Sequence, residues 1–409
     1  EAVFASMLAG NAVFFLDGYS KAIKVSSKGY PNLSVSESTR EKVLRGSKEG
    51  FTDAVKTNSA LVRKRIRDTR LKVKQKTLGE RSQTVVQILY MEDLVRPGLV
   101  EEIEKRLDSF VIDGVLDSGV LEQMTESSWL SPFPQFQTTE RPDKCAAEIL
   151  NGRILVLTDH SPVGLLLPAL FNDFLQVSED YYNRFAIVSL QRLIRYGAVL
   201  MTMLFSGTYL AVTNFHTQVL PTNLILSFSE ARQGVPFPGI LEVLLMELAF
   251  EMIREAGVRM PGPLGGTIGI VGGLIIGQAA VTANLVSPIV VVVVAVSALS
   301  SLAIPTDEFS APFRLLKFGF IILGGTMGVF GMVLGLYLVV SHLAGLKSFG
   351  IPYLSPFAAQ NREGYVGERD SFIRFPLPFL NRRPVYARKE EQIKLRNRKM
   401  EKEEGHVYR

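Results

Sequence analysis

The chain has 409 residues, of which 47% are hydrophobic, and its formal net charge is +5. Its mean hydropathy of +0.20 is high for a soluble protein. Cys145 is the only cysteine, which excludes an intrachain disulfide. Apolar residues concentrate between Tyr196 and Leu346, and charged sequence lies on both sides. This distribution predicts a membrane domain flanked by soluble parts.

Three parts follow from the distribution of charge. We expect residues 1–185 to form a soluble cytoplasmic α/β domain, residues 186–350 an all-α helical transmembrane domain, and residues 351–409 a basic cytoplasmic tail. The chain begins at Glu1 within a helical pattern and shows no basic-then-apolar signal segment there. We therefore expect it to be a piece of a longer protein.

The first part alternates strand and helix patterns. Apolar runs bounded by turn residues predict strands at residues 11–16, 21–25, 84–90 and 153–158, with a further apolar run at 163–167. Capping residues and amphipathic spacing predict helices at residues 38–66, 97–110, 115–124 and 146–150. This alternation predicts the α/β class.

Two segments of this part share one pattern. Leu8–Gly18 and Leu150–His160 each combine a helix end, a glycine, a strand and an aspartate in a turn. The repeat predicts two related lobes, an arrangement suited to gripping a ligand. The alternative is that the pattern is common local chemistry without duplication.

The run Arg63–Lys76 (RKRIRDTRLKVKQK) is strongly basic. Such a run is typical of nucleic-acid binding, but no aromatic residue interrupts it to stack on bases. A solvated cytoplasmic segment beside an anionic membrane is the favoured interpretation, so we expect no nucleic-acid partner.

Four apolar segments are candidate membrane crossings, at residues 193–214, 265–285, 289–304 and 316–346. Arg192 and Arg195 precede the first segment, and the tail is rich in arginine and lysine. The positive-inside rule then puts both ends in the cytoplasm, which requires an even number of crossings. We therefore expect four crossings, with the acidic helix near residues 236–258 interfacial or re-entrant. Arg314 and Lys317 would then lie outside, which counts against this topology.

Glycines recur in two of the apolar segments. One stripe, at intervals of four residues, consists of Gly265, Gly269, Gly273 and Gly277. A second stripe consists of Gly324, Gly328, Gly331 and Gly335. Glycine at this spacing lets another helix backbone approach closely. The glycine stripes serve helix packing, either within one subunit or around the axis of an oligomer.

Few polar residues interrupt the apolar segments. Gln278, Thr282 and Leu285 are predicted to share one helix face, which is the candidate lining of a pore. Hydrogen bonding between helices is the alternative role of such polar residues.

Three acids, Glu247, Glu251 and Glu255, recur four residues apart on the acidic helix. Like charges at this spacing destabilise a helix, and Arg254 and Arg259 could relieve them. The hypothesis is a ring of carboxylates near a cation path or a contact to a partner subunit. The alternative is a solvated face with internal ion pairs.

No enzymatic constellation is evident in the sequence. The histidines have no metal-ligand spacing, and neither a phosphate-binding loop nor a nucleophile elbow occurs. We therefore predict no catalytic residue, no metal and no cofactor.

Several long motifs resemble one family, the A subunits of spore germinant receptors (the GerA family). The motifs are Leu44–Asp68, Ile112–Gly119, Ser131–Asp143, Ala231–Pro238, Leu245–Gly257, Gly269–Pro288 and Ser348–Phe357. Together they cover nearly the whole chain. A paralogue from the sporulation stage V A operon has a similar layout, but residues 215–238 resemble a true receptor subunit more closely.

The resemblance implies a multi-pass protein of the spore inner membrane, with both termini in the cytoplasm or spore core. Family members act with B and C subunits to detect nutrients and trigger germination, with early release of monovalent cations. The A subunits are thought to form an oligomer, a pentamer, that serves as a ligand-gated channel in membrane lipid. A non-conducting scaffold for the B and C subunits is the alternative. A transporter would need inverted repeats with broken helices, which the sequence lacks.

Overall fold

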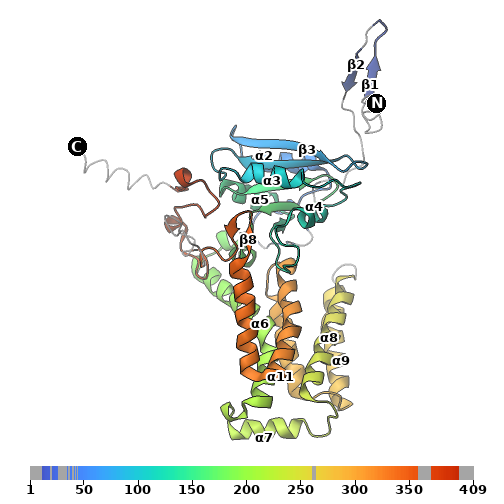
Figure 1. Cartoon of the computed structure of the whole chain (residues 1–409), viewed down its shortest axis with the longest axis vertical. Coiled ribbons are helices and arrows are strands. Elements are labelled where there is room, and N and C mark those ends of the chain that lie inside the picture. Colours follow the sequence, from blue (N-terminus) through green and yellow to red (C-terminus); the bar gives the residue numbers. More distant parts are fainter. Residues whose placement is uncertain are drawn as a thin grey trace, which may run out of the picture.

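The computed structural model describes residues 12–18, 21–25, 35, 37–38, 41, 43, 45–259, 264–357 and 370–395. A domain of mixed strands and helices, the sheet domain (residues 45–183), lies at one end of a set of long helices (Figure 1). We call these long helices, α6 to α11, the helical bundle. The predicted order of a mixed helix and strand region followed by a helical region is confirmed.

The sheet domain is built on five antiparallel strands in the order β3-β4-β6-β7-β5. The strands are Leu71–Leu78 (β3), Thr84–Met91 (β4), Gln137–Thr139 (β5), Ile154–Thr158 (β6) and Gly164–Leu167 (β7). The helices are Val55–Arg65 (α2), Leu99–Leu107 (α3), Ser118–Thr125 (α4) and Pro142–Leu150 (α5).

Both faces of this sheet are covered by helices. Ile154 and Val156 of β6 pack with α3 and α4, whereas Leu155 and Leu157 pack with α2 and α5. A strand buried on both faces has no polar side to show, which explains why β4 and β6 read as continuous apolar runs.

Two expectations about this domain were wrong. Among the described residues of the helix predicted over 38–66, only α2, near the end of that range, is helical. The basic run contains an unpredicted strand, β3, at the edge of the sheet. Its alternate residues Leu71 and Val73 pack on the core, and lysines between them face acidic residues such as Glu104, 2.9 Å from Lys74. Lysines on an edge strand also disfavour pairing with another chain.

The predicted duplication into two lobes is not confirmed. The strands Ala12–Phe15 (β1) and Ala22–Val25 (β2) pair with each other as a hairpin that stands apart from the sheet domain in Figure 1. β6 is instead the central strand of the sheet. The shared motif therefore occupies two different structural positions.

The helical bundle begins directly after two short 3-10 helices, Phe171–Leu175 (η1) and Ser178–Tyr181 (η2). Its helices are Phe185–Phe215 (α6), Thr222–Ala231 (α7), Gly239–Val258 (α8), Leu264–Thr282 (α9), Pro288–Leu302 (α10) and Asp307–Gly345 (α11). Among the described residues, α6 and α11 are long and apolar enough to cross a membrane, and α10 is a shorter apolar helix.

The long helix α11 is a helical hairpin. Gly328 has φ 62° and ψ −144°, which no α-helix contains, and the chain reverses there. A Cβ atom on Gly331 would lie 2.4 Å from the carbonyl oxygen of Leu323, eight residues earlier and about 12 Å away in a straight helix. We call residues 307–327 the first arm and residues 329–345 the second arm. The apolar segment at residues 316–346 is therefore not one continuous helix, as expected, but parts of two arms.

The acidic helix α8 has one exposed face, where Leu248 is 53% and Met252 is 68% exposed, and one buried face. It runs beside α9 along the bundle, and it is α7 that lies across the end far from the sheet domain (Figure 1). Glu242 and Glu247 of α8 are both 0% exposed. The expected interfacial or re-entrant position stays a prediction, but the sequence did not show that these two acids would be buried.

The C-terminal segment is not a separate tail where it is described. After α11, β8 (Lys347–Ser348) and β9 (Ile351–Pro352) form a short hairpin that places Phe349 in the core of the sheet domain. Residues 370–395, with the 3-10 helices Leu377–Phe379 (η5) and Lys389–Glu391 (η6), also pack on that domain. The backbone N–H of Arg388 donates to the carbonyl of Leu94 at 2.8 Å.

Candidate functional site

A chain of ion pairs joins α8 to the first arm of α11. We call its members the charge array: Glu247, Glu251, Arg254, Asp307, Arg314 and Lys317. Glu247 and Glu251 lie four residues apart on α8, and Arg314 and Lys317 lie three apart on α11. Residues at these spacings share one helix face, so two facing helices bring opposite charges together.

Glu247 lies at the centre of the charge array and is fully buried. Lys317 Nζ donates to its Oε2 at 2.6 Å, and Ser206 of α6 donates to its Oε1 at 2.6 Å. Lys317 is itself 2% exposed. A carboxylate or an ammonium so deeply buried is tolerable only with such a partner, because each ion has lost its hydration.

The array continues toward the sheet domain. Glu251 accepts from Lys317 at 3.4 Å and from Arg314 at 3.1 Å. Arg254 donates to Asp307 at 2.7 Å and to Ser301 of α10 at 2.9 Å. The array therefore ties together α6, α8, α10 and α11.

Glu255 and Glu242 lie outside the array. Glu255 is paired with Arg259, four residues on, at 2.5 Å on the surface. Glu242 accepts from Arg232 at 3.1 Å and from the backbone N–H of Ser287 at 2.9 Å. The sequence suggested that Arg254 would offset the charge of Glu251. Arg254 instead donates to residues of α10 and α11.

The predicted pore residues face away from the charge array. Gln278 and Thr282 are exposed on the outer side of α9, and the Thr282 hydroxyl donates to the Gln278 carbonyl at 2.8 Å. Leu285, 45% exposed, lies beyond the last residue of α9. The chain turns at Asn284, whose φ is 54°, so the three residues do not share one helix face.

The first glycine stripe allows close packing within this chain. A Cβ on Gly273 would lie 3.3 Å from the Phe250 ring of α8, and one on Gly277 would lie 3.2 Å from Val291 of α10. Gly265 and Gly269 belong to the same helix, but their surroundings lie outside what is described.

The second glycine stripe serves α6 and the two arms of α11. Gly324 meets α6 at Gly207, whose carbonyl oxygen would lie 2.3 Å from an added Cβ. Gly331 and Gly335 let the second arm approach the first, and Gly328 makes the turn. This stripe therefore combines three roles: contact with α6, contact between the two arms, and the turn itself.

Two buried arginines attach the C-terminal segment to the rest of the chain. Arg192 of α6 is 0% exposed and donates to Asp180 at 3.0 Å and to Asp370 at 2.7 Å. Arg153 lies 5.1 Å from the ring centroid of Tyr386 and pairs with Glu148 at 3.2 Å. Burial raises the pKa of the Tyr386 hydroxyl well above its usual range, so Tyr386 stays a neutral donor.

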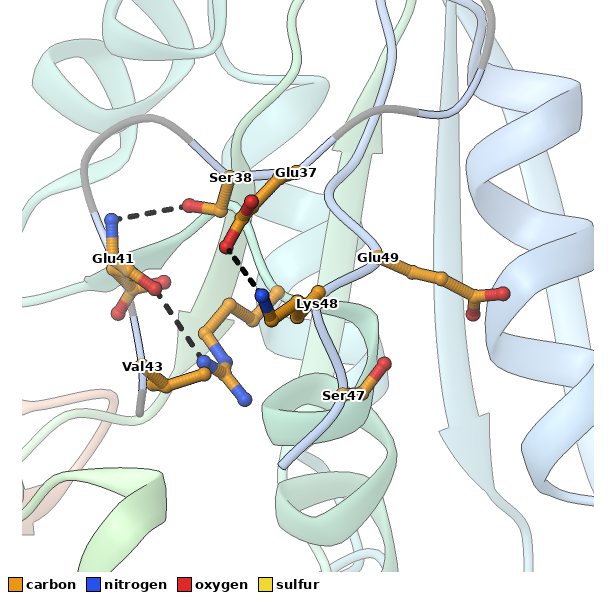
Figure 2. A pocket seen from close by; sticks show the side chains of 8 residues that line it. Glu37, Ser38, Glu41, Val43, Ser47, Lys48 and Glu49 are labelled. Carbon is orange, nitrogen blue, oxygen red and sulfur yellow. Dashed lines mark hydrogen bonds and ion pairs between the residues drawn. The ribbon is translucent and has the colours of Figure 1, made fainter. Parts of the chain in front are cut away.

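Two hollows among the described residues differ in volume. Around Arg141, charged side chains including Glu37 and Lys48 close on one another (Figure 2), and the cavity volume is about 0 Å³. A second hollow of about 370 Å³ lies between α6 and α7, lined by residues that include Tyr209, Phe228 and Arg232. Arg232 is already held there by Glu242.

The bases of the charge array were the part that sequence reasoning missed. Arg314 and Lys317 were noticed only as charges on the wrong side of the expected topology. Their spacing of three residues, matching acids four apart on another helix, was the available signal. No group of His, Cys, Asp or Glu suited to a metal occurs among the described residues.

Fold and site together define a class of protein: a bundle with membrane-length apolar helices and internal ion pairs, carrying a mixed helix and sheet domain. The family model for "Bacillus/Clostridium GerA spore germination protein" matches residues 1–386. The chain therefore belongs to the GerA family of spore germination proteins.

Individual relatives agree with this assignment. The chain is 38% identical to spore germination protein GerLA of Bacillus cereus, over 97% of this chain and 80% of that protein. It is 40% identical to spore germination protein A1 of Bacillus subtilis, over 91% and 77% of the two chains. It is 41% identical to a B. subtilis membrane protein, YfkQ, described as uncharacterized, over 94% and 75%.

One solved structure is also similar in sequence. It is the N-terminal domain of the A subunit of the Bacillus megaterium spore germinant receptor GerK3, 39% identical over 30% of this chain and 97% of that one. The two superpose with a TM-score of 0.25.

Proposed function

We propose that this chain is a multi-pass membrane subunit of a spore germinant receptor, and that several copies form a channel that nutrients open to monovalent cations. Membership of the GerA family supports the role in germination. One observation carries the channel: Gln278 and Thr282 project outward from a helix that is apolar apart from these two residues and Thr267.

The reason is the cost of polar groups in lipid. An amide such as Gln278 that faces hydrocarbon leaves its hydrogen-bonding groups unsatisfied, at several kcal/mol. That cost disappears if the outer side of α9 faces water or other copies of α9. Copies arranged around an axis with α9 innermost would give a polar, water-filled centre. We propose this arrangement, with five copies as the family resemblance implies.

The route of the chain through the bundle supports a multi-pass topology. α6 leads away from the sheet domain, and the second arm of α11 returns to it (Figure 1). Between them, α8, α9, α10 and the first arm run along the bundle, so the crossings are even in number. The sheet domain and the basic C-terminal segment then lie on one side, which we assign to the cytoplasm or spore core.

The charge array has a mechanical role in this proposal. Glu247 and Glu251 are bonded to Lys317 and Arg314, so they hold α8 rather than offer open ligands to a cation. α8 packs on α9 through Phe250 and Gly273. Contacts with the B and C subunits that disturb the array would therefore move the helix proposed to line the pore.

The test is cation flux through the reconstituted protein. We expect Thr282→Leu and Gln278→Leu to reduce potassium flux without changing the amount of protein in the vesicles. Thr326→Leu is the matched control, because Thr326 is also exposed and donates to the carbonyl four residues earlier, Ile322, at 2.7 Å. Unchanged flux in both α9 variants would show that this face does not line the path.

A second candidate function is a non-conducting scaffold for the B and C subunits. The neutralised acids of α8 favour it, because Glu247 and Glu251 are not free carboxylates. Oligomer size in mild detergent separates the two candidates. A ring of copies with potassium flux supports the channel, whereas a monomer that binds the partner subunits and conducts nothing supports the scaffold.

A further inference from the structure

The loop between α4 and β5 belongs to the sheet domain and contacts the helical bundle. Its Phe133 is 2% exposed, with its ring centroid 5.5 Å from that of Phe313 and 6.1 Å from that of His342. Ser131 Oγ lies 2.9 Å from His342 Nε2. The inner side of the loop is therefore fixed against both arms of α11.

These contacts define how far the loop reaches down the bundle. Phe313 lies about 9 Å along the first arm from Asp307, where that arm begins. His342 lies about 21 Å along the second arm from the turn at Gly328, less than the hydrocarbon thickness of about 30 Å. The loop thus extends past the end of the helices to the level at which a bilayer would surround them.

The outer side of the same loop is apolar and exposed. Trp129 is 83% exposed and Leu130 is 75% exposed. The loop is nevertheless held in shape: buried Gln135 accepts from the Ser127 N–H at 2.9 Å and donates to the Ser128 carbonyl at 3.3 Å. The exposure of the two side chains is therefore built into the fold.

We propose that Trp129 and Leu130 insert into the interfacial region of the lipid bilayer and dock the sheet domain on the membrane surface. The proposal rests on the proposed membrane placement of the helical bundle. Tryptophan favours this region because its ring is amphipathic, with an apolar body and one polar N–H.

Lipid is favoured over a second protein chain by two observations. The loop lies at the depth of the helices, as its contacts with Phe313 and His342 fix. The second arm, which the loop contacts at His342, also exposes apolar side chains, with Tyr337 68% and Leu338 58% exposed. One environment can cover both surfaces, and for membrane-length helices that environment is lipid.

The chain contains a single tryptophan, so Trp129 fluorescence reports on this loop alone. We would reconstitute the whole chain into phosphatidylcholine vesicles, with and without bromine on the acyl chains, and isolate the floating vesicles. We expect brominated lipid to remove most of the emission and aqueous acrylamide to have little effect.

The matched control moves the tryptophan away from the membrane. In the variant Trp129→Phe with Lys72→Trp, the probe lies on β3, at the opposite edge of the sheet from β5. β5 is the strand beside the bundle, because Thr138 donates to Glu308 at 2.6 Å. We expect this probe to be quenched by acrylamide and unaffected by brominated lipid.

Each other outcome overturns the proposal. Quenching of Trp129 by acrylamide alone would mean that the loop is in water. Protection from both quenchers would mean that protein covers it, as a second copy or another subunit would. In either case the multi-pass placement stands if the protein floats with the vesicles. Failure to float would instead refute the membrane placement itself.

Discussion

Two lysine–glutamate pairs, one in the sheet domain and one in the helical bundle, have opposite surroundings. In the sheet domain, Lys72 and Glu92 form an ion pair at 3.2 Å with side chains 45% and 62% exposed. In the bundle, Lys317 and Glu247 pair at 2.6 Å with side chains 3% and 0% exposed. In the bundle, large apolar side chains are exposed while this ion pair is buried: Phe330 is 67% and Val333 is 61% exposed.

This difference fits the proposed placement of the helical bundle in a membrane and of the sheet domain in water. In water, apolar burial drives folding and ion pairs at the surface contribute little. Between apolar helices surrounded by lipid, apolar contact gives no preference for protein over lipid, so close packing and polar pairs hold the helices together. The same pair of residue types is therefore peripheral in one region and central in the other.

The largest effect is expected from Lys317→Met. It leaves Glu247 and Glu251 without their shared cation in a buried site, which costs about 3–5 kcal/mol. We expect a corresponding loss in the free energy of unfolding, measured in detergent from the helical circular dichroism signal.

The double variant Lys317→Met with Glu247→Leu is its control. Replacing both buried charges by apolar groups should restore most of the lost stability, because no ion is then left without a partner. If the single and double variants are equally unstable, the loss comes from packing rather than from an unpaired charge.

A smaller effect is expected where α6 crosses α11. Gly324→Val would put Cβ 2.3 Å from the carbonyl oxygen of Gly207, and we expect a loss of about 1–3 kcal/mol in unfolding free energy. Gly319→Val, in the same arm with nothing within 4 Å, is the matched control and should be nearly neutral. Equal losses would point to helix propensity instead of the crossing.

The next test concerns the acid Glu122 of the sheet domain. Burial first, then the nearby Glu308, Glu126 and Asp117, raise its pKa from 4.5 to about 8. The folded state therefore holds this proton more tightly than the unfolded chain, and stability declines as pH rises from about 4.5 to about 8.

Glu122→Gln removes that dependence, because an amide carries no charge to desolvate. We expect the variant to match the parent at pH 4 and to exceed it by about 1–2 kcal/mol at pH 9, in thermal unfolding at several pH values. A parallel pH profile for the two proteins would mean that Glu122 titrates normally.

The smallest effect is expected from Lys72→Met, which breaks an exposed pair. Surface pairs contribute about 0.2–1 kcal/mol, and salt screens them. We expect a change below about 0.5 kcal/mol that vanishes at high salt. A loss comparable with that of Lys317→Met would remove the contrast between the two regions.

Sequence patterns located the elements of the sheet domain with uneven success. The strands β4 and β6 were predicted because burial on both faces leaves a run of apolar residues. β3 was missed because an edge strand alternates apolar residues with lysines, and the lysines were read as one basic run. Residues 45–54 were wrongly joined to α2, since a helical pattern carries no sign of a loop held by distant contacts.

The candidate site was predicted only in part. The acids of α8 were found by their spacing, but their partners Arg314 and Lys317 come from a helix more than 50 residues away in the chain. Four crossings were expected because α11 read as one apolar segment. The chain reverses at Gly328, which has a positive φ. A glycine within an apolar run does not by itself predict such a reversal.

By itself, the sequence determined which segments are helical and apolar, where the glycines and polar residues recur, and which family the motifs resemble. These properties are local, since they depend on residues within a few turns or on runs of matching letters. Only the tertiary structure decided that Glu247 is paired with Lys317, that Gly324 meets α6 and that the C-terminal segment packs on the sheet domain. Such pairings bring together residues far apart in the chain, and the free energy of burying a charge depends on what lies opposite it in space.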